Sequence, residues 1–173
     1  MLSTILLIIV VAVIAVLIYA ATRPDAFKIE RTTRISASPD KVFPLIADLH
    51  AFNTWNPFAK SDPTTRIYRG AQSGVGAAYD WAGGKSGAGS MVVTEATSPS
   101  RVAMDLHFTK PMVANKKVLF TLTPAGNAVD VSWAMTGTSP FLHKLFGLFF
   151  SMEKMVGGEF VKGLAGLKAM AEH

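Results

Sequence analysis

The sequence predicts an α+β domain, in which a curved antiparallel β-sheet wraps around a long C-terminal helix, preceded by a single transmembrane helix. Three observations lead to this fold class. The first 22 of the 173 residues carry no charged side chain. Short segments separated by glycine, proline, serine and asparagine clusters fill the middle of the chain, and residues 140–172 have helical periodicity. Successive strands followed by one long helix are typical of α+β folds.

Residues 2–21 form an apolar run that is long enough to cross a membrane as a helix. Only Ser3, Thr4 and Tyr19 carry polar side-chain atoms in this run. At about 1.5 Å per residue, a helix of this length covers ~30 Å, which is the thickness of the hydrocarbon core of a bilayer. A cleaved secretory signal is the alternative, but the basic segment that opens such signals is missing and the apolar run is long for one. We therefore expect residues 1–22 to be an uncleaved anchor and residues 23–26 to be a linker.

Basic residues follow the apolar run, whereas only the terminal amine precedes it. Arg23, Lys28, Arg31 and Arg34 all lie shortly after the run. Positive charge accumulates on the cytoplasmic side of membrane spans. The sequence therefore predicts a single-pass protein of the cell membrane, whose domain of residues 27–173 lies in the cytoplasm.

The soluble part opens with a predicted strand and a capped helix. Residues 27–36 alternate between apolar and polar side chains, as a half-buried strand does. Ser38-Pro39-Asp40 has the order of a helix N-cap, a proline in the first turn and an acidic residue. A broken helical turn follows over residues 50–58.

Six further strands are expected to form a meander, because short links between successive strands imply antiparallel neighbours. Pro124-Ala125-Gly126-Asn127 joins the last two as a hairpin. The expected final helix runs from Pro140 to Glu172, with a bend at Gly157-Gly158. The expected strands cover residues 65–69, 76–81, 89–96, 101–108, 115–123 and 128–138.

Short motifs follow one another along the soluble part: Ser38-Pro39-x-x-Val42-Phe43, Asp48, Trp55-Asn56-Pro57-Phe58, Tyr79-x-Trp81, Gly87-x-Gly89-x-Met91 and Gly163-Leu164-x-x-Leu167-Lys168. Their order and spacing resemble the START-like superfamily, also called SRPBCC, whose bacterial members are often named polyketide cyclase/dehydrase proteins. The resemblance covers about residues 27–171. It implies a helix-grip (START/Bet v 1-like) fold with a deep apolar cavity between the concave face of the sheet and the last helix. It implies no single chemistry, since members bind lipids, sterols or polyketides, act as co-chaperones, or catalyse reactions.

Large side chains on the inward faces of the expected strands are the candidate ligand contacts. A sheet that closes on one helix leaves a space that side chains or a ligand must fill. A filled core without a ligand is the alternative. The candidate lining residues are Trp55 near the mouth, Tyr79, Trp81, Met104, Phe108, Phe120, Trp133 and Phe160.

Catalytic signals are weak, and the candidates are Glu95, Tyr79 and His107. Glu95 shares the alternation of Met91 and Val93, so the sequence allows it to enter the cavity with a raised pKa and to act as an acid or base. The alternative is a strand-end charge that pairs with Arg101 or a lysine. His107 alternates with apolar neighbours and is expected to point away from the cavity. No cluster of histidine, aspartate and glutamate has metal-ligand spacing, so we expect no metal and no cofactor.

Two segments bear on partners. Gly84-Lys85-Ser86 lacks the earlier glycine of a phosphate-binding loop, where Tyr79 stands, and a strand follows it; the segment is predicted to be a flexible hairpin over the cavity. Residues 141–152 are apolar nearly all round, and form either a buried helix start or a membrane-facing gate. Nucleic-acid binding is not expected, because no basic stripe with aromatic residues occurs.

The sequence therefore predicts membrane-anchored binding of an apolar small molecule, such as a lipid, an isoprenoid or a polyketide-like compound. An enzyme of the polyketide cyclase/dehydratase type is one alternative. A membrane-tethered interaction or stress-response module without a ligand is the other. The formal net charge of +5 suits an anionic membrane surface, although the basic residues are dispersed along the chain.

Overall fold

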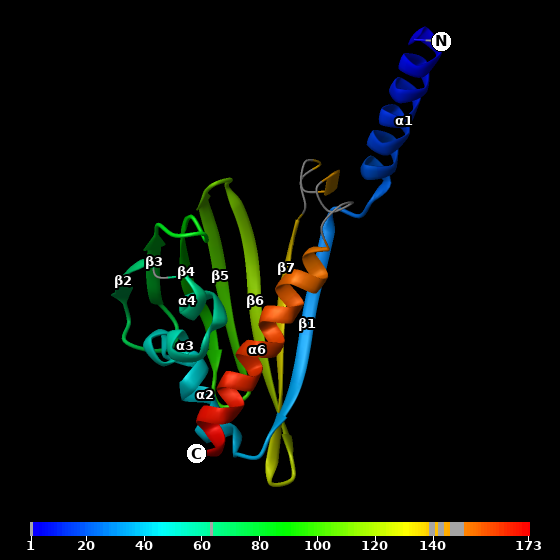
Figure 1. Ribbon diagram of the computed structural model, residues 1–173. Helices are drawn as coiled ribbons and strands as arrows, with labels where there is room; N and C mark the ends of the chain where they lie inside the picture. Colours follow the sequence, from blue (N-terminus) through cyan, green and yellow to red (C-terminus); the bar gives the residue numbers. More distant parts are fainter. Residues whose placement is uncertain (1, 63, 139–140, 142–143, 146–150) are drawn as a thin grey trace.

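The computed structural model describes residues 2–62, 64–138, 141, 144–145 and 151–173 (Figure 1). Its elements follow the predicted order. They are α1 (Leu2–Thr22), β1 (Ala26–Ile35), α2 (Pro39–Ala47), α3 (Leu49–Trp55), α4 (Pro57–Ser61), β2 (Thr65–Gly70), β3 (Ala77–Ala82), β4 (Ala88–Thr97), β5 (Arg101–Lys110), β6 (Ala114–Ala125), β7 (Ala128–Thr138) and α6 (Met152–Glu172).

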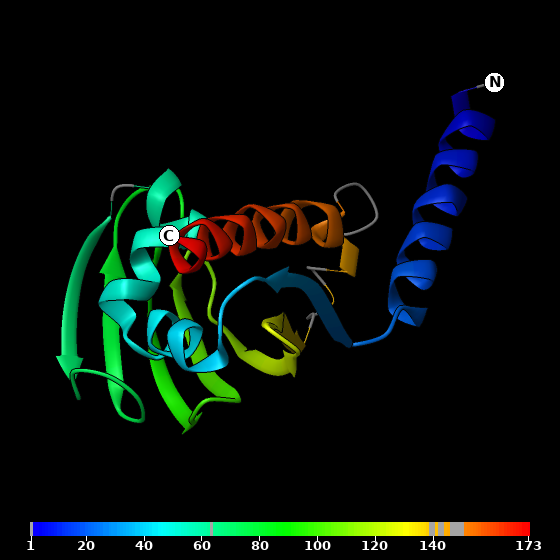
Figure 2. The same cartoon turned by 90° about the horizontal axis from the view of Figure 1, so that it is seen from below.

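Seven strands form one antiparallel sheet in the order β1-β7-β6-β5-β4-β3-β2. The strands β2 to β7 are consecutive neighbours, and β1 closes the sheet by pairing with β7, so that Ala26 lies opposite Thr138. Figure 2 shows the sheet curving around α6 and the short helices. The predicted α+β class and the meander are confirmed.

Local signals explain why the short helices begin and end where they do. The Ser38 hydroxyl accepts the backbone N–H of Lys41 at 3.3 Å and caps α2. Asp48 ends α2 and caps α3, because its carboxylate accepts the N–H of His50 at 2.8 Å. The side chain of Asn56 then caps α4 by accepting the N–H of Phe58 at 3.2 Å. The capped helix predicted at Ser38-Pro39-Asp40 is α2, and the broken helical turn predicted over residues 50–58 is two capped helices, α3 and α4.

The C-terminal helix begins later than the sequence predicts. Ser151 has a non-helical backbone and its hydroxyl accepts the N–H of Lys154 at 3.2 Å, so α6 starts at Met152 rather than at Pro140. Residues 142–143 and 146–150 lie outside the described residues, and with them most of the predicted gate of residues 141–152. The helix continues through Gly157-Gly158. At Gly157 a Cβ would lie 2.2 Å from the guanidinium of Arg31, so the glycine lets Arg31 reach across α6.

The core lies between the sheet, α6 and the helices α2 and α3. Its largest fully buried side chains come from all of these elements, which ties the sheet to both helical layers. They include Ile35, Ile46, Phe52, Trp55, Met104, Phe120, Leu164 and Leu167.

Helix α1 lies outside this core. It is the one helix among the described residues that is long and apolar enough to cross a membrane, over Ser3–Thr22. Most of its large apolar side chains are exposed. Its length and composition fit both a membrane anchor and a signal sequence.

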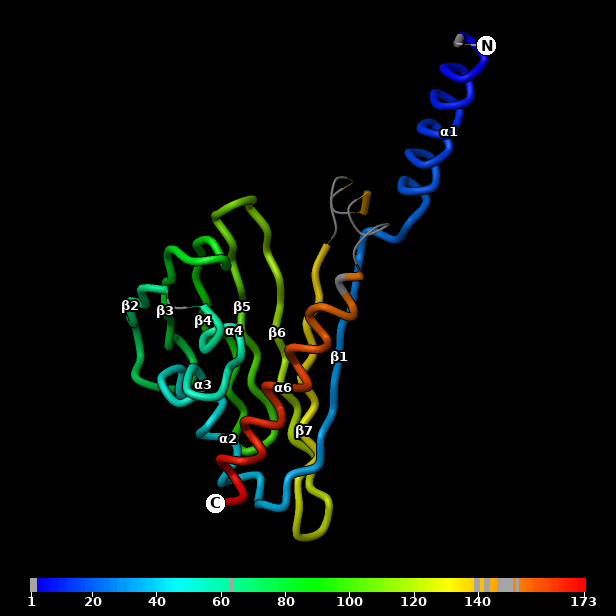
Figure 3. Tube along the Cα trace, in the orientation of Figure 1, coloured from blue at the N-terminus to red at the C-terminus, as the bar shows by residue number. Residues whose placement is uncertain are grey.

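Antiparallel pairing gathers particular strand termini at one end of the sheet. The starts of β1, β4 and β6 lie there together with the ends of β3, β5 and β7, because Ala26 pairs with Thr138 and Ala88 pairs with Lys110. We call this end of the sheet the linker end, since Arg23–Asp25 join α1 to it. Figure 3 shows α1 leaving the molecule at the same end as the β5–β6 turn, opposite the C-terminus.

Candidate ligand-binding cavity

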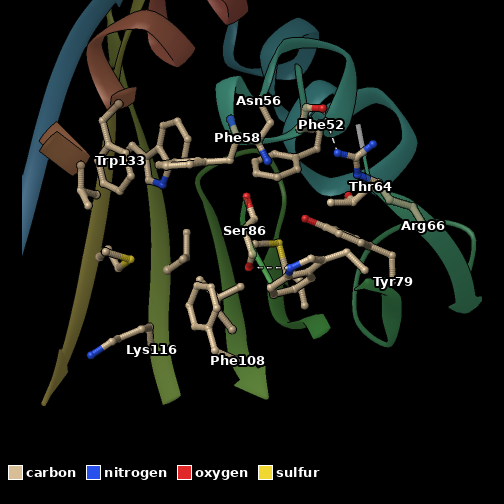
Figure 4. Close-up of a pocket in the computed structure, with 18 residues that line it drawn as sticks. Phe52, Asn56, Phe58, Thr64, Arg66, Tyr79, Ser86, Phe108, Lys116 and Trp133 are labelled. Carbon is tan, nitrogen blue, oxygen red and sulfur yellow. Dashed lines mark hydrogen bonds between the residues drawn. The ribbon is translucent and has the colours of Figure 1, made fainter. Parts of the chain in front are cut away.

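A cavity of about 200 Å³ lies between the sheet, the helices α3 and α4, and the first half of α6 (Figure 4). A dry cavity of about 150 Å³ takes benzene, so this one has room for a somewhat larger molecule. Most of the residues around it are apolar or aromatic. The lining consists of Phe52, Asn56, Phe58, Ala59, Thr64, Arg66, Tyr79, Trp81, Ser86, Met91, Leu106, Phe108, Lys116, Val118, Trp133, Met135, Val156 and Phe160.

One wall is an aromatic cluster that joins β7 to α6. The indole of Trp133 stacks on the ring of Phe160 with 4.1 Å between centroids and 9° between planes. Phe58 of α4 meets both rings edge-on, at 6.5 and 6.4 Å. Because contacts from two helices hold the indole, its orientation toward the cavity is fixed by packing.

The opposite wall is built on β3 and β5. Trp81 and Phe108 pack edge to face with centroids 5.5 Å apart, and Tyr79 lies beside Trp81. Gly89, which pairs with Trp81, leaves room for this packing, since a Cβ there would lie 2.4 Å from the indole. The glycine of the sequence motif around Met91 therefore serves the placement of an aromatic wall.

The loop of residues 83–87 lies beside the cavity and is tied down by Asp62. The buried carboxylate of Asp62 accepts the backbone N–H of Ser86, and these hydrogen bonds hold the pKa of Asp62 below its usual value. Gly84 has φ +67°, and a Cβ there would lie 1.9 Å from the carboxylate. The carboxylate of Asp62 thus accepts the backbone N–H of Ser86, a group that in a phosphate-binding loop would donate to the bound phosphate. Ser86 itself lines the cavity, as the predicted hairpin over it should.

Besides Asn56, Thr64 and Ser86, four side chains of the lining carry polar atoms. Burial raises the pKa of Tyr79 to about 12, so its hydroxyl stays protonated, and Figure 4 shows it directed into the cavity. Lys116 donates to the carbonyl of Thr138 at 2.7 Å, and burial lowers its pKa. Arg66 donates to the carbonyl of Ala59 at 2.8 Å. The indole nitrogen of Trp133 is buried and has no hydrogen-bond partner within the part of the chain that the structure describes. The described lining contains no carboxylate and no imidazole.

The cavity extends to the linker end of the sheet. Lys116, Phe108 and Ser86 lie close to the strand termini gathered there, and all three are half-buried. Phe52 and Phe160, deeper in the lining, are fully buried. The half-buried part of the lining therefore includes residues at the end at which α1 joins the sheet.

Five of the eight candidate lining residues contact the cavity: Tyr79, Trp81, Phe108, Trp133 and Phe160. The other three, Trp55, Met104 and Phe120, lie in the core outside the described lining. The indole of Trp55 donates to the carbonyl of Leu45 at 2.8 Å, which holds it within the α2–α3 layer rather than at a mouth. Phe120 faces inward, but Phe52 and Trp55 cover it, with centroids 6.1 and 6.0 Å away.

Of the three catalytic candidates, only Tyr79 reaches the cavity. A β-bulge between Val93 and Glu95 breaks the alternation on which the placement of Glu95 depended. Glu95 instead pairs with Arg101 at 2.9 Å, and its side chain is 44% exposed, which is the alternative that the sequence left open. His107 lies away from the cavity and interacts with Asn115 of β6.

Sequence reasoning missed several lining residues, and for two of them a signal exists. Lys116 lies on the same face of β6 as Val118 and Phe120, so its position faces inward. Arg66 pairs with Trp81 and shares its face. A basic side chain on the inward face near the end of a strand, such as Lys116 or Arg66, indicates that the cavity has a polar edge there. Phe52, Asn56 and Phe58 had no such signal, because their placement depends on how α3 and α4 fold back over the sheet.

The curved sheet, the helix across it and the cavity between them define a helix-grip protein with a Bet v 1-like fold. The family described as polyketide cyclase / dehydrase and lipid transport matches residues 26–172. The chain belongs to this family, which lies within the SRPBCC superfamily that the sequence motifs resemble. Among curated proteins, none matches the sequence at a significant level.

Solved structures share the fold at low sequence identity. Protein MLL2253 from Mesorhizobium loti superposes with a TM-score of 0.61 at 14% identity, covering 83% of this chain and 96% of that one. The Aha1 dimer from Colwellia psychrerythraea superposes with a TM-score of 0.60 at 16% identity, covering 84% of this chain and 96% of that one. Ara h 8.0201 gives 0.57 at 10% identity, with 84% and 97% covered. At these identities the likeness concerns the fold alone.

Proposed function

We propose that this protein is a membrane-anchored binding protein, which takes an apolar small molecule of the lipid, isoprenoid or polyketide-like kind between the bilayer and its cavity. The observation that carries the proposal is the position of the cavity. It is largely apolar, and it extends to the end of the sheet to which α1 is joined.

The linker is too short to let the cavity drift far from a bilayer that α1 spans. Arg23, Pro24 and Asp25 separate α1 from β1, and three residues extend over roughly 10 Å at most. In this arrangement residues 1–22 are the anchor and residues 27–173 form the binding domain. The basic residues after α1 favour the cytoplasmic side for that domain, because positive charge accumulates on this side of membrane spans.

The linker end also exposes apolar side chains that suit contact with lipid. Met112 and Val113, in the β5–β6 turn, are 41% and 69% exposed, and Phe141 is 46% exposed. The exposed Lys110 precedes the turn, which suits an anionic headgroup layer. A docked turn of this kind would bring the cavity mouth to the membrane surface.

The free energy of transfer into the cavity indicates that ligands are selected by their shape and by their polar groups, rather than by hydrophobicity alone. Moving an apolar ligand from water into the cavity gains about 25 cal/mol per Å² of apolar surface buried. A ligand that leaves the hydrocarbon core of a bilayer gains almost none of this, because it moves from one apolar environment to another. Selectivity therefore depends on the fit of the aromatic walls and on the polar atoms of the lining.

Native mass spectrometry of the full chain, purified from membranes in detergent, tests the proposed binding. We expect wild-type protein to carry a bound apolar molecule or to take up added geraniol, an isoprenoid alcohol of suitable size. Leu106→Trp, which fills the cavity from β5, should lose this adduct. Leu119→Trp, the same change on the outward face of β6, should keep it. Wild-type protein that neither carries nor takes up an apolar molecule would contradict the proposal.

An enzyme of the cyclase/dehydratase type is the second candidate. The observation in its favour is Tyr79, whose neutral phenol points into the cavity and is suited to donate a hydrogen bond to a substrate carbonyl. Turnover of a poly-carbonyl compound by wild-type protein, lost in Tyr79→Phe while binding persists, would favour the enzyme. The module without a ligand is less favoured, since a cavity of about 200 Å³ is not a filled core.

A further inference from the structure

The indole N–H of Trp133 is a buried donor without a partner among the described residues. Trp133 is 3% exposed, and its stacking on Phe160 prevents the ring from turning toward another acceptor. Buried polar groups in folded proteins nearly always have a hydrogen-bond partner, because an unpaired one loses its hydration without compensation. The unpaired nitrogen therefore calls for an explanation at this position.

The other two tryptophans provide a comparison within the same chain. The indole of Trp55 donates to the carbonyl of Leu45 at 2.8 Å, and that of Trp81 donates to the carbonyl of Ser86 at 3.4 Å. Trp133 differs from both in that its side chain lines the cavity while its buried nitrogen has no partner among the described residues. The exception thus coincides with the site at which a ligand would supply the acceptor.

We propose that the ligand of this cavity is an apolar molecule that carries an oxygen acceptor, such as a carbonyl, ester or hydroxyl group, and that Trp133 Nε1 donates a hydrogen bond to that oxygen. This inference rests on the proposed binding function and deepens it by naming the class of ligand. A plain hydrocarbon would leave the indole nitrogen unpaired.

The charges of the described lining agree with an oxygen acceptor. Arg66 and Lys116 are the charged residues of the lining, and both are cations. The protonated hydroxyl of Tyr79 adds a second donor directed into the cavity. Neutral or anionic oxygen groups suit these donors, whereas a protonated amine would meet like charge.

The source of the ligand strengthens the argument. An oxygen atom deep in the hydrocarbon of a bilayer has no donor to satisfy it, and it gains a hydrogen bond on moving to Trp133. A hydrocarbon of the same shape gains nothing comparable. The indole thus provides a means of choosing oxygenated molecules from a large excess of lipid tails.

A matched pair of probes tests the inference: tetralin, a bicyclic hydrocarbon, and 1-tetralone, the same skeleton with one carbonyl. Their affinities are measured by ¹H–¹⁵N NMR titration of the full chain in micelles, for wild type and Trp133→Phe. Partitioning of each probe into the micelles is the same for both proteins and cancels in the wild-type-to-variant ratio. We expect Trp133→Phe to lower the affinity for 1-tetralone by about 3- to 10-fold relative to the affinity for tetralin. This loss corresponds to one net hydrogen bond.

The same spectra contain three indole N–H signals, one for each tryptophan. The Trp133 signal should move to higher frequency with 1-tetralone and much less with tetralin, while the Trp55 signal should stay nearly constant with both. Trp55→Phe is the matched control variant, because it removes a buried indole outside the described lining. It should leave the relative affinity for the two probes unchanged.

Equal effects of Trp133→Phe on both probes would overturn the inference and leave the proposed binding function standing. Failure of wild-type protein to bind either probe would overturn both. If Trp133→Phe does not fold, the wild-type titration decides: the inference is contradicted when the Trp133 signal responds alike to the ketone and the hydrocarbon.

Discussion

Gly163 of α6 lies directly against the indole of Trp133 on β7, so that a Cβ at this position would be 2.6 Å from the ring and 2.9 Å from Pro57. The contact sets the distance between the helix and the sheet at the aromatic wall of the cavity. It explains why a glycine, which weakens a helix in water, stands in the middle of α6. Close approach at this point is a condition for the stacking of Trp133 on Phe160.

Gly163→Ala should therefore destabilise the protein. The methyl group meets a ring and a proline that are both held by their neighbours, and overpacking of this kind typically costs about 1–3 kcal/mol. The better helix propensity of alanine offsets part of this cost, so we expect a net loss of about 1 kcal/mol. The free energy of unfolding, measured by denaturant titration, checks this. Gly158→Ala is the matched control, since nothing lies within 4 Å of a Cβ there and the position is exposed. It should stabilise the helix by about 0.5–1 kcal/mol. Equal effects of the two changes would contradict the packing role of Gly163.

Tyr79 should make the stability of the protein depend on pH in the alkaline range. Its pKa rises from 10.0 to about 12 on folding because burial disfavours the phenolate. The folded state holds the proton while the unfolded state releases it, so stability falls as the pH rises above the unfolded pKa of about 10. Two pKa units correspond to about 2–3 kcal/mol, lost between pH 10 and pH 12. Tyr79→Phe should lack this part of the alkaline loss. Unfolding curves for both proteins at several pH values would show it, and parallel pH profiles would refute the burial of the phenol.

Asp62 should hold the loop of residues 83–87 in place only while it is ionised. Its hydrogen bonds from Ser86 lower its pKa in the folded state. The stabilisation is therefore present above the unfolded pKa of about 4, and it is lost as the pH falls through the lower folded value. Asp62→Ala should speed hydrogen exchange of the Ser86 amide at neutral pH. Wild-type protein should approach that rate only in acid, after correction for the intrinsic pH dependence of exchange. Equal protection of Ser86 in both proteins at neutral pH would show that Asp62 does not tie the loop.

Much of the fold could be predicted from the sequence, because alternation, turn residues and caps are local signals. The hairpin at Gly126 and the strand of residues 128–138 are examples, and β7 has the predicted bounds. The start of α6 could not be read in this way, since apolar periodicity continues across Ser151 and conceals the cap. The alternation alone allowed Glu95 to face the cavity, but a single bulge reverses the face of every later residue in a strand, and the alternative pairing with Arg101 is the one present.

The candidate site was predictable only in part. The alternation of strand residues identifies Trp81, Phe108 and Trp133 as inward-facing. It does not show how far along the sheet the cavity extends, so it predicts Met104 and Phe120 as lining residues as well. That depth depends on Phe52 and Trp55, which fold over the sheet from α3 and cover its far part. The tether from Asp62 to Ser86 joins residues on different elements and leaves no pattern in the sequence.

The orientation of the cavity toward the bilayer can be measured with single cysteines, since the chain contains none of its own. Met112→Cys and Val75→Cys place a fluorophore at the linker end and in the β2–β3 turn at the opposite end of the sheet. Both native side chains are exposed, which makes the two sites a matched pair. The full chain is reconstituted into vesicles that contain nitroxide-labelled lipid. We predict strong quenching at position 112 and little at position 75. Equal quenching at the two sites, or stronger quenching at position 75, would contradict a cavity that opens toward the membrane.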